Sequence, residues 1–363
     1  MQRIKVIHLI SSMQLGGVEK GINLSVEELN YHFDYKVVTL SNHNSFINDK
    51  VANHFIFAKN KFIIFSIIPI LIQLRKEKPD ILILSLWKSY LVGWLAKKIL
   101  NENTKIIAFI HNEKYFHWLD KFFTQLILKK TTAIAFDSKH SQKAFQHLLS
   151  NTTPQFVIPY IFNNDKTDRQ TLQNVKLPIR FLYAGRLHES KNLEKVLDFF
   201  FEFKKIEPQF LFDIYGTGSA KYQEILNKKI DTLQLNNQVR FKGVFDASQT
   251  SNIYPLYHFY IQMSNNEGMA MSVVDAMIHG VIPIVTPVGE IKNYVTDHMN
   301  GFIVQDNSNN HELYEMGKKI HDLFLNEDSY LLMKQNCANH FKNESNYIDA
   351  FKNMINSSKS NSK

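Results

Sequence analysis

Two carboxylates stand eight positions apart in a nearly apolar run, at Glu267 and Asp275. From Ala270 onward the run has apolar residues on nearly every side of a helix, which predicts a buried helix. A buried carboxylate is costly unless it is hydrogen-bonded or paired, so Asp275 needs a partner. A ribose, with its adjacent hydroxyls, is one candidate partner, and a structural arginine or a backbone amide is the other.

The turn before this helix offers a second set of polar groups. The carboxylate of Glu267 could accept hydrogen bonds from sugar hydroxyls, and the amides of Gly268, Met269 and Ala270 would point at an anion. One segment could therefore hold both ends of a nucleotide sugar.

Arg186 and Lys191 lie in YAGRLHESKNLEKVL, on the expected loop between a strand and a helix. Exposed amides and the helix dipole favour an anion at such a place. Arginine can hold two oxygens at a fixed geometry while lysine adds a mobile charge, so a pyrophosphate clamp is one interpretation. A solvated basic loop explains the same spacing equally well.

Three weaker signals depend on position alone. Gly16 and Gly17 could let the backbone approach a ligand after the first strand, although such pairs are more often only tight turns. The fuller dinucleotide fingerprint is missing, and the same caution applies to Gly216 and Gly218. His111 ends the strand KIIAFIH, where an imidazole could bond a sugar hydroxyl or orient a backbone group.

Short buried strands alternate with helical stretches, which predicts parallel sheets covered by helices on both faces. The first series of strands is RIKVIHLI, YKVVTL, DILILSL, KIIAFIH and TAIAFDS. The second series is RFLYAG, FLFDIYG, QVRFKG, HFYIQMS and VIPIVT. Ligands bind such sheets at the carboxyl ends of their strands.

The series restarts after the polar stretch from Asn163 to Pro178, so two doubly wound, Rossmann-like domains are expected, facing each other across a cleft. We expect a first domain over 1–170 and a second over 171–340. Residues 341–363 would form a C-terminal helix that returns to the first domain, followed by a disordered tail from Asn356.

Composition narrows the class of protein. A single cysteine, Cys337, and no secretion pattern at the N-terminus fit a reducing cytoplasm. No apolar stretch reaches the roughly 20 residues that cross a bilayer. The net charge of +8 suits anionic partners, but no zinc-ligand cluster, basic tract or aromatic RNA motif favours nucleic acid.

With these residues assembled, the chain resembles the retaining glycosyltransferases of family 4, which have the GT-B fold. The matching pieces follow the family's order over most of the chain: LGGVEKGI, KPDILILS, FIHN, VIPYIFNND, YAGRLHESKNLEKVL, VRFKGVF and EGMAMSVVDAMIHGVIPIVTPVGEIKNYVTDHMNGFIV. Only the last piece is specific by itself, and the others persuade by their order.

The resemblance implies transfer of a sugar, most simply from a UDP-sugar, with retention of configuration and without a required metal or other cofactor. It places the donor diphosphate at Arg186 and Lys191, the donor sugar at Glu267 and the ribose at Asp275. It places the backbone around Phe245 near the base, and it makes 1–170 the acceptor-binding domain and 171–340 the nucleotide-sugar domain. His111 would lie near the reacting sugar, and Gly16 and Gly17 near the diphosphate and the acceptor.

The expected enzyme is a hexosyltransferase of bacterial surface-polysaccharide synthesis (capsule, O-antigen or lipopolysaccharide) with a glycan or lipid-linked glycan acceptor. The chain departs from the family pattern at Asp275, where a second glutamate is usual, and at Glu290, where a glycine is common. These departures keep open a catalytically silent sugar-nucleotide-binding subunit. A nucleotide-sugar epimerase of the same shape is a third interpretation.

Two aromatic and aliphatic segments, 114–130 and 62–74, carry the composition of helices that lie on a membrane surface. The apolar residues of 114–130 could equally face the core of the first domain. We expect a cytoplasmic protein with peripheral contact to the anionic inner membrane, where Lys129 and Lys130 would meet acidic lipid.

Overall fold

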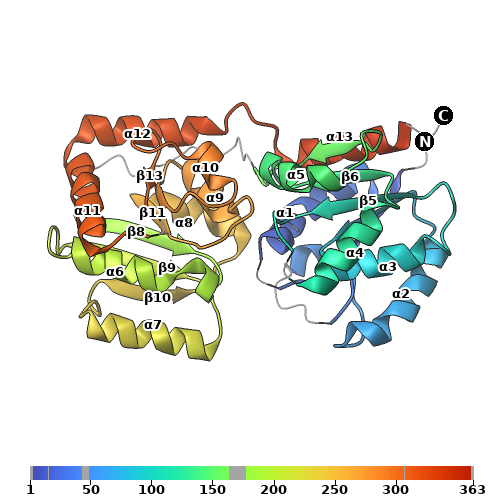
Figure 1. Ribbon diagram of the computed structural model, residues 1–363, viewed down its shortest axis with the longest axis horizontal. Helices are drawn as coiled ribbons and strands as arrows, with labels where there is room; N and C mark the ends of the chain where they lie inside the picture. The colour runs from blue at the N-terminus through green and yellow to red at the C-terminus, as the bar shows by residue number, and fades with distance from the viewer. Residues whose placement is uncertain are drawn as a thin grey trace. The chain divides into compact units, whose positions relative to one another are not determined.

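The computed structural model describes residues 3–14, 16–42, 49–115, 117–162, 177–305 and 307–360. The chain divides into two compact units, Met1–Phe162 with Ser345–Lys363, and Asn163–Glu344 (Figure 1). All but the last two positions of the expected joining stretch, 163–178, lie outside the described residues.

The first unit is built on a seven-stranded sheet in the order β3-β2-β1-β4-β5-β6-β7. Its strands are β1 (Lys5–Ile10), β2 (Asp34–Thr39), β3 (Phe55–Ile56), β4 (Ile81–Ser85), β5 (Lys105–Ile110), β6 (Ala133–Phe136) and β7 (Gln155–Val157). Every pairing is parallel. The central strands are buried on both faces, which is why they read as nearly continuous apolar runs.

Helices cover this sheet on both faces. They are α1 (Gly17–His32), α2 (Ile63–Glu77), α3 (Trp87–Ala96), α4 (Trp118–Leu128), α5 (Lys139–Phe145) and α13 (Tyr347–Ser360), with short 3-10 turns η1 (Asp49–His54) and η2 (Gln146–Leu148). Helix α3 packs against both α2 and α4, and α1 packs against α13. Strand order reverses between β1 and β4, and right-handed crossovers on the two sides of that point place helices on opposite faces.

Helix α13 lies on the first unit although it closes the chain. The backbone amide of Tyr347 donates to the carbonyl of Ile161 at 2.8 Å, and Phe351, Met354 and Ile355 are fully buried. The expectation of disorder from Asn356 is wrong as far as Ser360, because the buried face continues the helix through these polar residues. The last three positions lie outside the described residues.

The second unit repeats the architecture with a six-stranded parallel sheet in the order β10-β9-β8-β11-β12-β13. Its strands are β8 (Ile179–Ala184), β9 (Phe210–Tyr215), β10 (Val239–Gly243), β11 (Phe259–Gln262), β12 (Ile282–Val285) and β13 (Phe302–Ile303). Its helices are α6 (Leu193–Phe203), α7 (Ala220–Thr232), α8 (Thr250–Ile253), α9 (Met271–Ile278), α10 (Ile291–Tyr294), α11 (Asn310–Leu325) and α12 (Glu327–His340), with 3-10 turns η3 (Glu189–Lys191), η4 (Ala247–Gln249) and η5 (Tyr254–Leu256).

An aromatic cluster fixes α6 on the second sheet. Phe199, Phe200 and Phe203 of the helix contact the rings of Phe181 on β8 and Phe210 on β9, and all five are at most 2% exposed. Such buried aromatic pairs add edge-to-face and stacking attraction to the burial of apolar area. The start of α6, and the basic loop before it, are therefore held at the carboxyl end of β8.

The prediction of two alternating series of strands and helices is confirmed. The buried helix expected from Ala270 is α9, in which every residue except Ser272 is buried. Strands β3, β7 and β13 were not predicted, because a strand of two or three residues is too short to show a hydrophobic periodicity. Within the described ranges, no helix combines the length and apolar character that a membrane span requires.

Candidate functional site

The basic loop after β8 meets the acidic turn after β11. The Nζ of Lys191 donates to Oε1 of Glu267 at 2.6 Å, and both side chains are mostly buried. Lys191 ends the turn η3, so its position is set by β8 and α6, whereas Glu267 follows β11. The structure thus joins two residues that the sequence places 76 positions apart.

A glutamine orients the Glu267 carboxylate. The Nε2 of Gln262 donates to Oε1 of Glu267 at 2.9 Å. Its own Oε1 accepts from the hydroxyls of Tyr260 at 2.7 Å and Ser272 at 3.0 Å. Because both ends of the amide are engaged, the carboxylate is held in one orientation before any ligand arrives.

The turn that carries Glu267 is held from both sides. Its neighbour Asn265 receives a hydrogen bond from Asn192 Nδ2, and the Tyr294 hydroxyl donates to the carbonyl of Met269. Gly289 has φ of +57°, and a Cβ there would lie 2.2 Å from the carbonyl oxygen of Glu267. Only glycine permits this close approach, so the glycine before Glu290 is required by the geometry of the turn.

The amides of Gly268, Met269 and Ala270 lead into α9. Ala270 takes a left-handed conformation with φ of +53° at the N-cap. The part of the chain that the structure describes offers none of these three amides a hydrogen-bond acceptor. Unpaired amides at a helix N-terminus favour an anion, so anion binding at this turn stays a prediction.

Arg186 lies at the carboxyl end of β8 with its side chain exposed. Its carbonyl accepts a hydrogen bond from the Tyr183 hydroxyl at 2.9 Å. Burial raises the pKa of Tyr183 well above its ordinary value; Glu267 raises this pKa further, while Arg186 lowers it. Tyr183 is therefore close enough to both Glu267 and Arg186 for their charges to shift its pKa. The exposed guanidinium of Arg186 remains available to an anion.

Asp275 lies one turn into α9 and is buried. The pKa of the neighbouring Tyr254 hydroxyl is raised well above its ordinary value by burial and then by Asp275. The Tyr254 ring lies 6.3 Å from the ring of Phe245, which also meets Tyr215 edge-on. Phe245 and Asp275 are thus both neighbours of Tyr254.

Two glycines after β9 serve the packing of the loops. Gly216 has φ of +153°, and a Cβ there would lie 1.8 Å from the carbonyl oxygen of Gly185. A Cβ on Gly218 would lie 2.0 Å from the carbonyl oxygen of Leu187. These glycines bring the loop after β9 against the basic loop after β8, which is the tight-turn role rather than a dinucleotide fingerprint.

In the first unit, His111 directly follows β5 and belongs to a buried polar chain. Its Nε2 lies 2.9 Å from Ser85 Oγ, and its Nδ1 lies 3.1 Å from the Tyr160 hydroxyl. Ser85 continues the chain to His8 Nε2 at 2.7 Å, and His8 Nδ1 reaches the Tyr35 hydroxyl at 2.6 Å. Both ring nitrogens of His111 are thus engaged inside the unit.

Burial keeps both histidines neutral. It lowers the pKa of His8 from 6.5 to about 3. It lowers the pKa of His111 well below 6.5, and the nearby His8 adds to the shift. Each imidazole therefore offers one donor and one acceptor. The hydroxyls of Ser85, Tyr35 and Tyr160 can pair with them.

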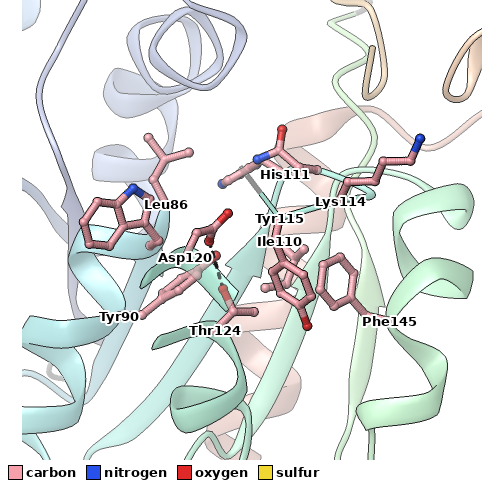
Figure 2. A pocket seen from close by; sticks show the side chains of 11 residues that line it. Leu86, Tyr90, Ile110, His111, Lys114, Tyr115, Asp120, Thr124 and Phe145 are labelled. Carbon is pink, nitrogen blue, oxygen red and sulfur yellow. Dashed lines mark hydrogen bonds between the residues drawn. The ribbon is translucent and has the colours of Figure 1, made fainter. Parts of the chain in front are cut away.

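A cavity lies beside His111 within the first unit (Figure 2). Its walls come from the ends of β4 and β5 and from three helices, and they comprise Leu86, Trp87, Tyr90, Ile110, His111, Asn112, Lys114, Tyr115, Asp120, Thr124 and Phe145. Asp120 is buried and accepts from Thr124 Oγ1 at 3.1 Å. Aromatic walls around a few polar groups are typical of sites for small polar molecules.

Gly16 and Gly17 lie at the start of α1. Gly16 is the N-cap and has extended backbone, and Gly17 is the first helical residue. A Cβ on Gly16 would meet the carboxylate end of Glu19, so a side chain there would displace a flexible neighbour rather than backbone. Neither glycine is required by a left-handed conformation.

The structure gathers the predicted residues in two places. In the second unit, Arg186, Lys191, Glu267, Gly268, Met269, Ala270, Asp275 and Phe245 all lie at the carboxyl edge of the sheet or on the helices that leave it. His111, Gly16 and Gly17 belong to the first unit and lie after its strands β5 and β1.

Sequence reasoning missed Gln262 and Asp120. A polar residue at the end of the apolar strand FYIQ could have indicated Gln262. Asp120 stands in the apolar, aromatic segment HWLDKFF, which is the same signal that identified Asp275. The composition of 114–130 left open a membrane-surface helix and a helix facing the core, and the acid in it indicates the second.

A family model named Glycosyl transferases group 1 matches residues 164–340. The peptide N-acetylglucosaminyltransferase GtfA subunit of Streptococcus pneumoniae is 28% identical over 138 residues, which cover 37% of this chain and 26% of that protein. An uncharacterized glycosyltransferase of Methanocaldococcus jannaschii is 24% identical over 283 residues, 72% of this chain and 70% of that protein. The chain therefore spans about a quarter of the pneumococcal relative, which carries further sequence.

Among solved structures, HepE of Anabaena in complex with UDP and glucose superposes with a TM-score of 0.79. The match covers 98% of this chain and 99% of HepE at 16% sequence identity. A match this extensive at such low identity establishes a shared fold. Residues 164–340 match the group 1 glycosyltransferase model, and the chain as a whole has the GT-B fold.

Proposed function

We propose that this protein is a retaining glycosyltransferase that moves a sugar from a UDP-sugar to a growing, lipid-linked glycan in bacterial surface-polysaccharide synthesis. The observation that carries the proposal is the pairing of Lys191 with Glu267 beside the unpaired amides of 268–270. A cation, an acid and an anion-binding helix start then lie together at the carboxyl edge of the second sheet, within the matched domain.

In this proposal the donor lies along that edge. Arg186, Lys191 and the amides bind the diphosphate, and Glu267 accepts hydrogen bonds from the sugar hydroxyls. Asp275 holds the ribose, and the base lies beside Phe245, which shares the neighbour Tyr254 with that carboxylate. The complexes of HepE with UDP and with UDP-glucose support the choice of UDP.

Transfer with retention requires the acceptor oxygen to reach the anomeric carbon from the side on which the diphosphate leaves. The bond from that carbon to the phosphate oxygen breaks, a bond to the acceptor oxygen forms, and the acceptor's proton passes to the leaving phosphate. Arg186 and Lys191 stabilise the charge that develops on the phosphate, so no protein base is needed. Such stabilisation also needs no metal, and full activity in excess EDTA would be the expected result.

The first unit would bind the acceptor. His111, at the edge of its cavity, is a neutral imidazole fixed by Ser85 and Tyr160, and its ring would lie beside the reacting sugar. The Asp120 carboxylate would accept a hydrogen bond from a hydroxyl of the glycan acceptor. The aromatic walls would cover an apolar face of a sugar ring (Figure 2). Gly16 and Gly17 would let the acceptor approach the start of α1 closely.

We further propose a cytoplasmic location with peripheral contact to the anionic inner membrane. The net charge of +8 and the exposed apolar residues of the first unit support it. A lipid-linked acceptor would then be reached from the membrane surface.

A second candidate is a sugar-nucleotide-binding subunit that supports a partner transferase without turnover of its own. The pneumococcal relative's name, which describes a subunit, and Glu290 in place of the usual glycine favour this reading. The geometry accommodates Glu290, whose amide donates to the carbonyl of Gly268 at 3.1 Å.

A panel of nucleotide sugars tests the proposal. The correct donor at 100 times its dissociation constant should stabilise the fold by about 2.7 kcal/mol in a thermal unfolding assay. Purified protein with that donor and a lipid-linked acceptor extract should then release UDP. Stabilisation without release would favour the silent subunit, conversion of the donor without acceptor would show an epimerase, and neither effect from any nucleotide sugar would refute the proposal.

A further inference from the structure

Helix α2 is apolar on two opposite sides. Its inner side places Ser66, Ile70 and Leu74 in the interior of the first unit. Ile63 and Ile67 flank this stripe and pack partly against the same core. The inner side alone therefore packs the helix against the unit. Helix α3 packs between α2 and α4, so α2 lies at the end of this row of helices (Figure 1).

The outer side of α2 carries large apolar residues in the open. Ile64, Ile68 and Ile72 recur every four positions and are 76%, 68% and 65% exposed. Phe65 on the same side and Phe62 at the N-cap are 64% and 70% exposed. A helix that is apolar all round is normally buried, and a contiguous exposed patch marks an interaction surface.

Cations flank this patch at both ends. Two exposed lysines precede the helix, and three exposed cations lie in or just after its last turn: Lys59, Lys61, Arg75, Lys76 and Lys78. Between residues 59 and 76 the sequence contains no acid. The acid that follows, Glu77, is already paired with Lys5 at 2.7 Å, and this contact lowers its pKa.

We propose that the outer side of α2 is the surface by which this protein lies on an anionic lipid bilayer. The four exposed apolar side chains of the helix and Phe62 enter the acyl boundary, and the flanking cations meet acidic headgroups. The patch offers only positive charge, which complements an anionic surface. The inference rests on the peripheral location proposed above, but not on the transfer reaction.

Helix α4, the other segment with such a composition, is a poorer match. Trp118 and Phe122 are exposed on it, but Thr124, Ile127 and Leu128 face the interior. Its buried acid, Asp120, lines the cavity instead. The structure therefore distinguishes two segments that composition alone ranks together.

Vesicle sedimentation of the full chain tests the proposal. Vesicles of phosphatidylglycerol and phosphatidylethanolamine should bind the protein, and vesicles of phosphatidylcholine alone should bind it much more weakly. Combining Ile64→Ser, Ile68→Ser and Ile72→Ser should weaken binding by about 100-fold or more, because three apolar side chains no longer gain from burial. Lys59→Gln and Lys61→Gln should each weaken it by about fivefold, and high salt should remove that difference.

Matched variants keep the test specific. Combining Leu325→Ser and Leu332→Ser removes exposed leucines from the second unit and should leave binding unchanged. Circular dichroism and thermal stabilisation by UDP should be the same for all variants, so that loss of vesicle binding is separable from loss of the fold or of donor binding. Equal binding to both kinds of vesicle would overturn the proposal.

Two further outcomes would also overturn it. If Trp118→Ser with Phe122→Ser abolishes binding while the α2 variant retains it, α4 is the membrane contact. If the wild type ignores vesicles but forms a dimer that the α2 variant cannot form, the patch is a protein interface.

Discussion

The carboxyl edges of the two sheets carry different chemistry on the same architecture. In the first unit, the polar groups around His111 satisfy one another, and burial keeps both histidines neutral. In the second unit, the edge carries charged groups: Lys191 and Glu267 form an ion pair between two loops, and Arg186 is exposed. Neutral polar groups suit the recognition of hydroxyl groups, whereas paired and exposed charges suit a diphosphate.

Topology fixes where a site lies but not what it binds. Both edges have the strand-loop-helix geometry that favours ligands, and the side chains at the ends of the strands decide which ligand is accepted. The variants that follow test that division, starting with the largest expected effect.

Lys191→Ala should have the largest effect, because it removes the charge proposed to stabilise the leaving phosphate and leaves the mostly buried Glu267 without its ion pair. We expect UDP release to fall by about 1,000-fold, within the range found when preorganised electrostatic groups are removed. Lys228→Ala, which removes an exposed lysine of α7, is the control and should keep full activity. Equal activity of the two variants would break the assignment of the charged edge to the diphosphate.

Asp275→Asn should weaken UDP binding by about 10-fold to 100-fold, the worth of a hydrogen bond to a charged group. The amide keeps the size of the side chain, so the melting temperature should change little. Calorimetry with UDP measures binding, and Asp231→Asn on α7 is an exposed control. A loss of folding as large as the loss of binding would show that Asp275 serves the structure rather than the ribose.

Acid should destabilise the fold through the first unit. His8 and His111 have folded pKa values below 6.5, so under that pH the unfolded chain binds more protons than the folded one. Their contribution is fully present above pH 6.5 and is lost as the pH falls, by up to about 1.4 kcal/mol per pH unit for each histidine.

Urea unfolding between pH 5 and pH 7.5 measures this dependence. His8→Gln should reduce its slope, because one of the two titrating groups is gone. His147→Gln, which replaces an exposed histidine of the same unit, should leave the slope unchanged. An unaltered slope in the His8 variant would mean that the buried chain does not control the acid sensitivity.

Asp120→Asn should have the smallest effect, an increase of about 10-fold in the KM for the acceptor. UDP binding should stay the same, because the cavity lies entirely within the first unit. Glu102→Gln, at an exposed loop of that unit, is the control. A change in donor binding instead of acceptor KM would contradict the division of labour between the two edges.

Much of the second unit's site could be predicted from sequence. Glu267 and Asp275 stood out because an acid in an apolar run needs a partner, and Arg186 and Lys191 because they follow a strand. These signals are local, and the resemblance to a family ordered them. Gln262 was missed because its role depends on Tyr260, Ser272 and Glu267 together, and spacing does not reveal such a network.

The first unit was less predictable. His111 was found by its place at the end of a strand, but its partners Ser85 and Tyr160 come from segments 26 and 49 positions away. The polar tail from Asn356 was expected to be disordered, yet the residues before it bury a face of α13 that continues the helix. Composition indicates what a segment favours alone, and a packed neighbour can outweigh it.

The sequence by itself determined the alternation of strands and helices, the restart that separates two sheets, and the acid-bearing helix α9. These depend on period and composition within a few residues of the chain. Only the tertiary structure decided which residues meet, such as Lys191 with Glu267 and His111 with Ser85. It also decided which side of α2 is exposed. The reason is physical, because pairing, burial and exposure are set by contacts between residues distant in sequence, and such contacts leave no mark in local spacing.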